Sequence, residues 1–480
     1  MTMKRKMTIT VFSLVFLFAG ALTAFAPEAS ASPIDVNGGV MNEYEYEEVF
    51  FLTGFPIRFS GKAVVTENDN KNTMTRTYRF TLTSPSGDKL TRNINYAANV
   101  TEHQEKGQKT AQFSVKSYSE KVTVGKDSYT LADYQFSEGM VTDLRVASSF
   151  YSGNTVGRKI YKHAIAADKK EQQITVNLNG RNMGYKNFWG ATETQLMDTE
   201  IVTPQGSAFV TSKASDSKSR VLQYEPFDPS LSSFSGGHAV ISSADMNSEY
   251  TYNIPFGAGR GSIKLEKKNT PKIERLIVPK FRDLNGHQAK DEIEKLYSLG
   301  IFDESSQFFS PNTPMTRYQY TVGILKAVDT RVLETPKKSS TARKPIFKDL
   351  SVKEPDYMFI ESAVEQGIIN GATPDKFNPD GALTRVQAVA ILVRALGMEG
   401  RAPSPGFKTH YADDDKIGSW AKDSVYVATQ IGLINGNTSN RFNPNQKLTR
   451  AQAALMTSRF LDFLENDLKQ NYRDDVLFAN

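Results

Sequence analysis

One pattern occurs three times after Pro271, and this repetition constrains the fold more than any other feature of the chain. Each copy has an aromatic residue two positions before an aspartate, a glycine followed by two apolar residues, a Phe-Ser-Pro or Phe-Asn-Pro tripeptide, and a Thr-Arg pair. The copies span residues 281–319, 347–387 and 411–452, and their Thr-Arg arginines lie 68 and 65 residues apart. Such a sequence predicts three similar units that pack against one another.

Each unit is predicted to fold as helix, loop, helix, because its apolar residues follow helical spacing. The first helix should end at Gly300, Gly367 or Gly432, where a left-handed residue is usual. The second should begin at Thr-Arg-x-Gln, which forms a capping box: the threonine hydroxyl caps the helix, and the glutamine returns to the cap amide. The predicted capping residues are Thr316, Gln319, Thr384, Gln387, Thr449 and Gln452.

The arginine in each box is unexpected, because a cation at the first turn of a helix opposes the helix dipole by a few tenths of a kcal/mol. One interpretation is an anion pocket for a carboxylate or phosphate, formed with the free backbone N–H groups. The other is an ion pair with the recurrent aspartate of the units, and the residues alone leave both open. The residues concerned are Arg317, Arg385 and Arg450, with Asp283, Asp349 and Asp413.

The combined motifs resemble S-layer homology repeats over roughly residues 280–468. The resemblance implies an all-α bundle of three repeats in a pseudo-threefold arrangement. Its grooves would bind secondary cell-wall polymer ending in a ketal-pyruvylated amino sugar, with the arginine on the pyruvate carboxylate. The polymer-binding residues implied in this way are Asp283, Arg317, Asp349, Arg385, Asp413, Trp420 and Arg450.

The first two repeats depart from the family pattern. Gln288 and Pro355 stand where the third repeat has Trp420, and Gly300 is followed by Ile-Phe-Asp rather than Ile-Asn-Gly. The third repeat is therefore expected to be the most complete, and the number of working grooves stays open.

From about residue 47 to 268 the pattern changes to alternating runs such as 76–82 and 173–178, broken by turn clusters. This period of two predicts half-buried antiparallel strands. The expected fold is one all-β sandwich or barrel, or two smaller modules that divide near residues 152–158. Trp189, the one tryptophan of this half, is expected to be buried.

The N-terminus carries the basic residues Lys4, Arg5 and Lys6, then an apolar run and Ala-Ser-Ala at 29–31, which predicts an exported protein. With no cysteine, the chain cannot use disulfides or a lipid-modified cysteine. The predicted organisation is a signal peptide at 1–31, a β-rich surface module at 32–270, and repeats at 278–340, 342–405 and 407–470.

A net charge of +5 over 480 residues is far below what is typical of a nucleic-acid-binding protein. The five histidines show no spacing typical of metal ligands. We therefore expect a non-enzymatic protein of a Gram-positive cell wall, anchored non-covalently and displaying a β module of unknown ligand. No cofactor, metal, nucleic acid or membrane partner is expected after signal cleavage. The alternatives are an anchored cell-wall or polysaccharide hydrolase, and an S-layer subunit or adhesin that self-associates.

Overall fold

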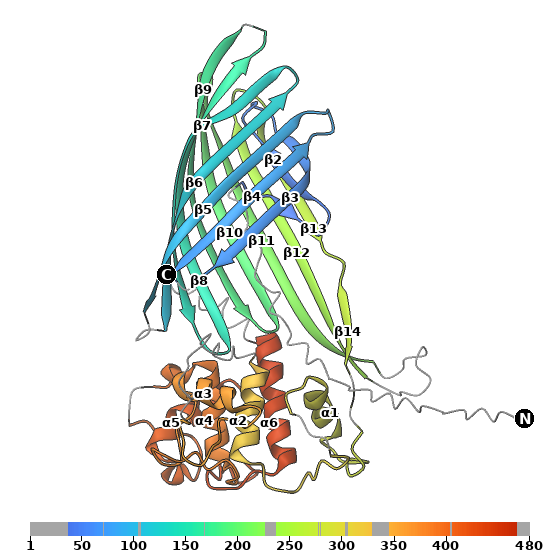
Figure 1. Cartoon of the computed structure of the whole chain (residues 1–480), viewed down its shortest axis with the longest axis vertical. Helices are drawn as coiled ribbons and strands as arrows, with labels where there is room; N and C mark the ends of the chain where they lie inside the picture. Colours follow the sequence, from blue (N-terminus) through green and yellow to red (C-terminus); the bar gives the residue numbers. More distant parts are fainter. Residues whose placement is uncertain are drawn as a thin grey trace, which may run out of the picture.

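The protein consists of a tall curved sheet standing on a cluster of helices (Figure 1). The predicted signal peptide and parts of the linkers around the repeats lie outside the residues that the structure describes. The computed structural model describes residues 37–70, 72–103, 107–167, 169–225, 237–276, 278, 280–302, 306–328, 345–403 and 406–467.

The N-terminal part is one antiparallel sheet in which strands β1 to β13 pair in sequence order, and β14 pairs with β12. Strand β8 runs without a break through residues 152–158, so the alternative of two β modules dividing there is wrong. The strands are β1 (Val40–Met41), β2 (Tyr46–Phe50), β3 (Ile57–Asp69), β4 (Thr73–Thr83), β5 (Lys89–His103), β6 (Gln108–Val124), β7 (Asp127–Leu144), β8 (Ser148–Ile165), β9 (Lys170–Asn187), β10 (Gly190–Thr203), β11 (Gly206–Glu225), β12 (Gly237–Ile254), β13 (Gly259–Lys268) and β14 (Lys272–Leu276).

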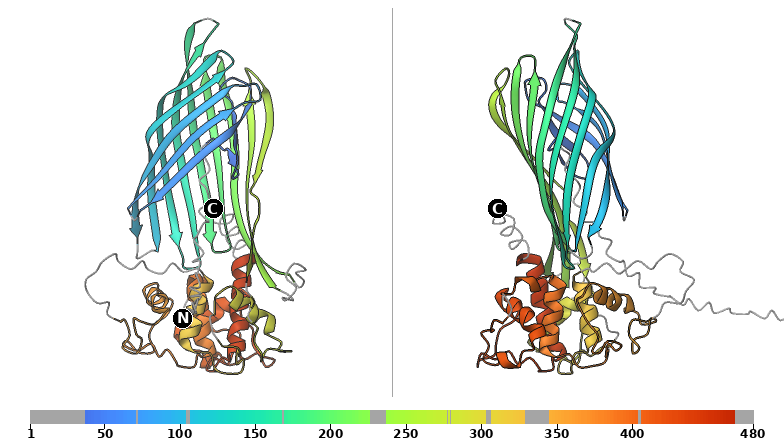
Figure 2. Two further views of the ribbon diagram at one scale, coloured as in Figure 1. Left: turned by 45° about the vertical axis from the view of Figure 1, so that its right-hand side comes forward. Right: turned by 90° about the vertical axis from the view of Figure 1, so that its left-hand side faces the viewer.

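The sheet curls into a nearly closed, barrel-like form, as Figure 2 shows from two sides. The residues before β1 meet strand β12 where the sheet closes: the Tyr250 hydroxyl donates to the carbonyl oxygens of Asn37 (2.9 Å) and Gly38 (2.7 Å). The Lys267 ammonium lies 2.7 Å from the Glu45 carboxylate at the same closure. Alternation along the strands places most apolar side chains in one interior core, while the outer face is largely polar and exposed to water.

Each predicted repeat contains the expected pair of helices. The glycines that follow the first helix of each unit have φ of 67°, 71° and 72°, the left-handed conformation that ends a helix. The helix pairs are α1 (Lys290–Ser298) with α2 (Arg317–Ala327), α3 (Tyr357–Glu365) with α4 (Arg385–Leu396), and α5 (Ser419–Gln430) with α6 (Arg450–Asp462). Among the described residues, no helix is both long and apolar enough to cross a membrane.

Equivalent residues of the three units are linked in a ring. Met315 N donates to Leu448 O, Leu448 N to Leu383 O, and Leu383 N to Met315 O, each at 2.9 Å. All three side chains are buried, between 0% and 3% exposed. Each unit therefore contacts both others immediately before its Thr-Arg helix start.

The sheet and the helices share a packed boundary. Ala147 N, in the β7–β8 hairpin, donates to Ala395 O of α4 at 3.1 Å. Asn187 Nδ2 donates to Leu464 O, in the turn that continues α6, also at 3.1 Å. Trp189 is buried as expected, but it packs into the core of the helical part rather than the interior of the sheet. These contacts join the lower end of the sheet to the helices.

Candidate functional site

The three arginines lie where the sequence predicts, at the first residue of the second helix in each unit. Thr316 Oγ1 accepts from Gln319 N at 3.1 Å, and Thr449 Oγ1 accepts from Gln452 N at 3.2 Å. The threonine therefore fixes the start of the helix and the direction in which the adjacent arginine leaves it.

The return hydrogen bond of the capping box differs between units. Gln387 Oε1 accepts from Thr384 N, and Gln452 Oε1 accepts from Thr449 N, both at 3.1 Å. Gln319 does not follow the expected box, because its Oε1 accepts from Arg450 Nη1 of the third unit at 3.2 Å. A charged donor makes a stronger hydrogen bond than a backbone amide, which favours this exchange of partner.

Each arginine packs on the phenylalanine of the next unit's Phe-Ser/Asn-Pro tripeptide. The Arg317 guanidinium lies 5.1 Å from the centroid of the Phe377 ring, and that of Arg385 lies 5.2 Å from Phe442. Arg450 closes the cycle, 4.7 Å from Phe309 of the first unit. The candidate sites are thus the junctions between units, each combining an arginine of one unit with a loop of the next.

The aspartates hold those loops in place. The Asp413 carboxylate accepts from the backbone N–H groups of Phe442 (2.7 Å) and Asn443 (2.8 Å). Asp349 accepts in the same way from the two residues after Lys376, and Asp283 from the two after Phe308. The second residue of each loop is left-handed, with φ between 56° and 60°, and the carboxylate clamps that turn.

The aspartates therefore act on the arginines through the loops. Within the described part of the chain, no ion pair joins Arg317 or Arg385 to these aspartates. Burial opposes ionisation of Asp349, but the two backbone N–H groups outweigh it and lower the pKa of that carboxyl. The same balance lowers the pKa of Asp283, with a further contribution from the charge of Arg450. Of the two interpretations of the arginines, the ion pair does not describe Arg317 or Arg385.

Arg317 and Arg385 have the same incomplete set of partners. Arg317 Nη2 donates to Asn370 O of the next unit, and Arg385 Nη2 donates to Asn435 O at 2.9 Å. In both side chains Nε is buried and has no hydrogen-bond partner among the described residues. Burial lowers the pKa of both guanidinium groups, as expected for cations removed from water without a counter-ion. An anion placed beside them would satisfy these donors.

Trp420 lies at the start of α5, in the third unit, and is 52% exposed. Arg394 of α4 lies beside it, with its guanidinium 5.9 Å from the ring and Nη2 donating to Trp420 O at 3.4 Å. The tryptophan therefore borders the junction between the second and third units. An exposed aromatic face of this kind can stack on a sugar ring.

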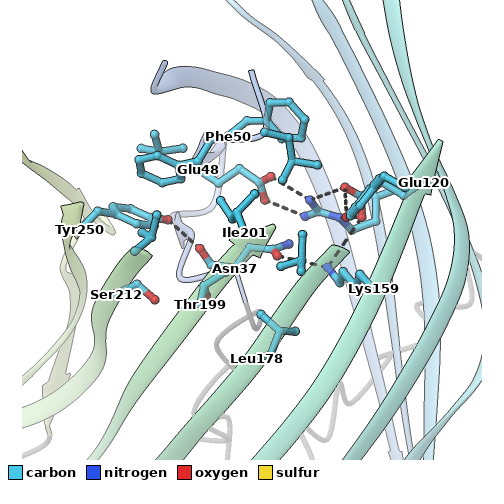
Figure 3. A pocket seen from close by; sticks show the side chains of 17 residues that line it. Asn37, Glu48, Phe50, Glu120, Lys159, Leu178, Thr199, Ile201, Ser212 and Tyr250 are labelled. Atoms are coloured by element: carbon cyan, nitrogen blue, oxygen red, sulfur yellow. Dashed lines mark hydrogen bonds and ion pairs between the residues drawn. The ribbon is translucent and has the colours of Figure 1, made fainter. Parts of the chain in front are cut away.

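The interior of the sheet holds a second candidate site, a cavity bordered by a charged wall and an apolar wall (Figure 3). Arg92 donates to both oxygens of Glu48 (2.6 and 2.8 Å) and of Glu120 (2.9 and 3.2 Å). Lys159 Nζ lies 3.2 Å from Asn37 Oδ1 and 3.8 Å from Glu120. The apolar wall comes from strands β9 to β11, from the end of β2 and from the two residues that follow it.

The charges of this wall balance one another. Burial alone would raise the pKa of Glu120, but the charges of Arg92 and Lys159 hold it at about 2. This network was not predicted from the sequence. Its signal was the presence of charged residues at inward positions of the alternating pattern, where an ordinary strand carries apolar ones.

Comparison with known proteins identifies the repeated units. The model of the S-layer homology domain matches residues 280–321, 346–389 and 410–454. The chain therefore contains three S-layer homology domains, at the positions predicted from the repeats.

Similar proteins include enzymes and surface-layer proteins. The chain is 30% identical over 213 residues to exoglucanase XynX of Acetivibrio thermocellus, covering 44% of this chain and 18% of that protein. It is 28% identical over 211 residues to a surface-layer 125 kDa protein of Lysinibacillus sphaericus, covering 43% and 17%. An S-layer protein of Bacillus licheniformis is 25% identical over 170 residues, covering 35% and 18%.

The chain thus spans less than a fifth of the length of these relatives. The three domains together with the surface-layer relatives indicate a secreted protein anchored at the cell surface.

Proposed function

We propose that the S-layer homology domains anchor the chain to a secondary cell-wall polymer by binding its carboxylate groups at the junctions between units. The observation that carries this proposal is the pair of buried Nε–H groups on Arg317 and Arg385, which lack a partner among the described residues. A ketal-pyruvylated amino sugar at the polymer end would supply the carboxylate, and its sugar ring would lie against the exposed face of Trp420.

The ring of hydrogen bonds through Met315, Leu383 and Leu448 supports a pseudo-threefold bundle as the arrangement of the units. In such a bundle the arginine-bearing junctions belong to one rigid body. Two or more junctions that bind one polymer raise the effective concentration of each other's ligand, so moderate single-site affinities give a long residence time.

Wall binding tests this proposal directly. Purified protein is mixed with purified walls, with and without extraction of the polymer, and the bound fraction is measured. We expect binding to require the polymer, to weaken as salt is raised, and to fall at least tenfold in the double variant Arg317→Ala, Arg385→Ala. Arg79→Ala is the matched control, because Arg79 is an exposed arginine of strand β4, outside the repeats. Full binding by the double variant contradicts the proposal.

We infer that the β module is displayed outward without catalysing a reaction. Glu48 and Glu120 share Arg92, and a carboxyl with a pKa of about 2, such as Glu120, cannot serve as a general acid near neutral pH. Burial raises the pKa of Glu193 to about 8, but that side chain is only 9% exposed and out of reach of a polysaccharide chain. Release of reducing sugar from walls by the purified chain, lost in Glu193→Gln, would contradict this inference in favour of an anchored hydrolase.

A further inference from the structure

The three junctions share one design but differ in what their arginine contacts. Arg317 and Arg385 each donate through Nη2 to one backbone carbonyl of the next unit, and their Nε groups have no partner among the described residues. Arg450 is only 7% exposed, and each of its three nitrogen atoms donates to the first unit. The partner set, rather than the arginine itself, distinguishes the third junction.

The partners of Arg450 all belong to the first unit. Nε donates to Phe309 O at 2.8 Å, Nη1 to Gln319 Oε1 at 3.2 Å, and Nη2 to the Tyr297 hydroxyl at 3.0 Å. Nε is the atom that is left without a partner at the other two junctions. The donors that would meet a carboxylate there are already satisfied by the protein here.

Two side chains of the first unit supply the acceptors for Nη1 and Nη2, whereas Nε donates to a backbone carbonyl. Tyr297 lies three residues before Gly300, where the second and third units have Val364 and Thr429. The valine side chain has no hydrogen-bond acceptor. The Thr429 hydroxyl is hydrogen-bonded to the Tyr411 hydroxyl of its own unit at 2.9 Å. Gln319 contributes the second acceptor, because it leaves the capping box that its counterparts complete.

The position of this junction in the chain gives the difference a physical reason. Units one and two, and units two and three, are joined by the polypeptide, whereas the third unit meets the first only through non-covalent contacts. Lys295 of α1 and Asp462 of α6 form a second link across the same junction, with Nζ 2.6 Å from Oδ1. Backbone hydrogen bonds cross all three junctions, so at this one the side-chain contacts add to them where the polypeptide does not join the two units.

We infer that Arg450 is a structural latch between the third and first units, and that the polymer is bound at the Arg317 and Arg385 junctions alone. The inference rests on the proposed anchoring function and assigns two binding junctions per chain instead of three. A carboxylate at Arg450 would have to displace buried hydrogen bonds that the protein already makes. Exchanging one satisfied hydrogen bond for another contributes little net binding free energy. Arg450 is accordingly a positioning residue, and Tyr297 and Gln319 determine that role.

The test combines stability with stoichiometry on the full chain. Purified polymer is titrated into the protein by calorimetry, and melting temperatures are measured for the same samples. We expect saturation at two sites, with Arg317→Ala and Arg385→Ala each removing one of them. Tyr297→Phe, which deletes only the hydroxyl, should lower the melting temperature by about 3 °C and leave the affinity within about twofold of wild type.

Arg450→Ala should lower the melting temperature more than Tyr297→Phe does. As in that variant, the number of polymer-binding sites should stay at two. Three sites in the wild type, or loss of a site in Arg450→Ala at unchanged melting temperature, would overturn the inference. Absence of polymer binding by the wild type refutes the proposed function instead, and the two melting temperatures then still decide whether Arg450 is a latch. If Arg450→Ala does not fold, Tyr297→Phe carries the same comparison.

Discussion

The Asp413 carboxylate accepts a 2.7 Å hydrogen bond from the backbone N–H of Phe442, a residue that lies 29 positions further along the chain. The ring of Phe442 in turn supports the Arg385 guanidinium of the preceding unit. One buried aspartate thus fixes the position of the aromatic ring against which an arginine of another unit packs. The aspartate and the Phe-Asn-Pro motif of one repeat therefore position the arginine of the preceding repeat, across the junction between them.

Asp413→Asn tests this relationship. The amide keeps one acceptor but turns an NH2 group toward the second backbone donor, so Phe442 or Asn443 loses its partner in a buried loop. We expect a loss of about 1 to 3 kcal/mol in the free energy of unfolding, measured with urea, and weaker polymer binding at the Arg385 junction. Asp415→Asn, at a neighbouring exposed carboxylate, should change neither.

The buried charges inside the sheet lead to a second prediction. Arg92→Met leaves Glu48 and Glu120 facing each other without their shared cation, in side chains that are 1% exposed. We expect a destabilisation of about 3 to 5 kcal/mol by urea unfolding. Arg79→Met on the outer face of the same region should cost less than about 0.5 kcal/mol, and equal losses in the two variants would contradict the role of the network.

Local sequence signals predicted the helical part well. The glycines at the helix ends and the threonines at the helix starts depend on neighbours within a few residues, so Gly367 and Thr384 could be placed from the sequence alone. Period-two alternation likewise predicted the strands, although it could not decide between one sheet and two modules. That decision depends on β8 pairing with both neighbours along its whole length.

The parts that sequence reasoning missed depend on long-range pairing. The partners of Arg92 lie 44 and 28 residues away, and only the register of the sheet brings Glu48 and Glu120 to the same height. The motif also predicts an equivalent arginine in all three repeats and does not distinguish between them. One part of the difference at Arg450 comes from Tyr297, which no motif of the repeat includes. The predicted completeness of the third repeat therefore did not say how its arginine is used.

The raised pKa of Glu193 predicts a pH dependence of stability. Burial is the main cause of the rise to about 8, and the carboxylates of Glu138 and Asp216 add to it. Since the folded state binds this proton more tightly than the unfolded state, with its pKa near 4.5, the stabilisation is complete below that value. It is lost progressively as the pH rises toward 8.

Urea unfolding at pH 5, 7 and 9 measures this effect. We expect the stability of the wild type to fall over this range by at least 1 kcal/mol more than that of Glu193→Gln, in which nothing at this position ionises. Glu102→Gln, an exposed carboxylate of β5, should keep the wild-type slope. Parallel pH profiles for the wild type and Glu193→Gln would contradict the prediction.

The two tryptophans should give opposite results. Trp189 is 1% exposed and packs into the core of the helical part, with its ring edge-to-face with Phe188 at 5.1 Å. Trp189→Ala removes a large side chain from that boundary, so we expect a loss of about 3 to 5 kcal/mol in the free energy of unfolding. Its effect on wall binding, for the fraction that is folded, should be small because the side chain lies away from the arginine junctions.

Trp420→Ala should leave stability within about 0.5 kcal/mol, because the side chain is 52% exposed, and should weaken wall binding several-fold if its face carries the sugar. Urea unfolding and the wall-binding assay, run on both variants, separate the two roles. Weak binding by Trp189→Ala with normal stability would place a ligand at the boundary between sheet and helices. Unchanged wall binding by Trp420→Ala would show that Trp420 does not contact the polymer, and recognition would then be assigned to the arginines alone.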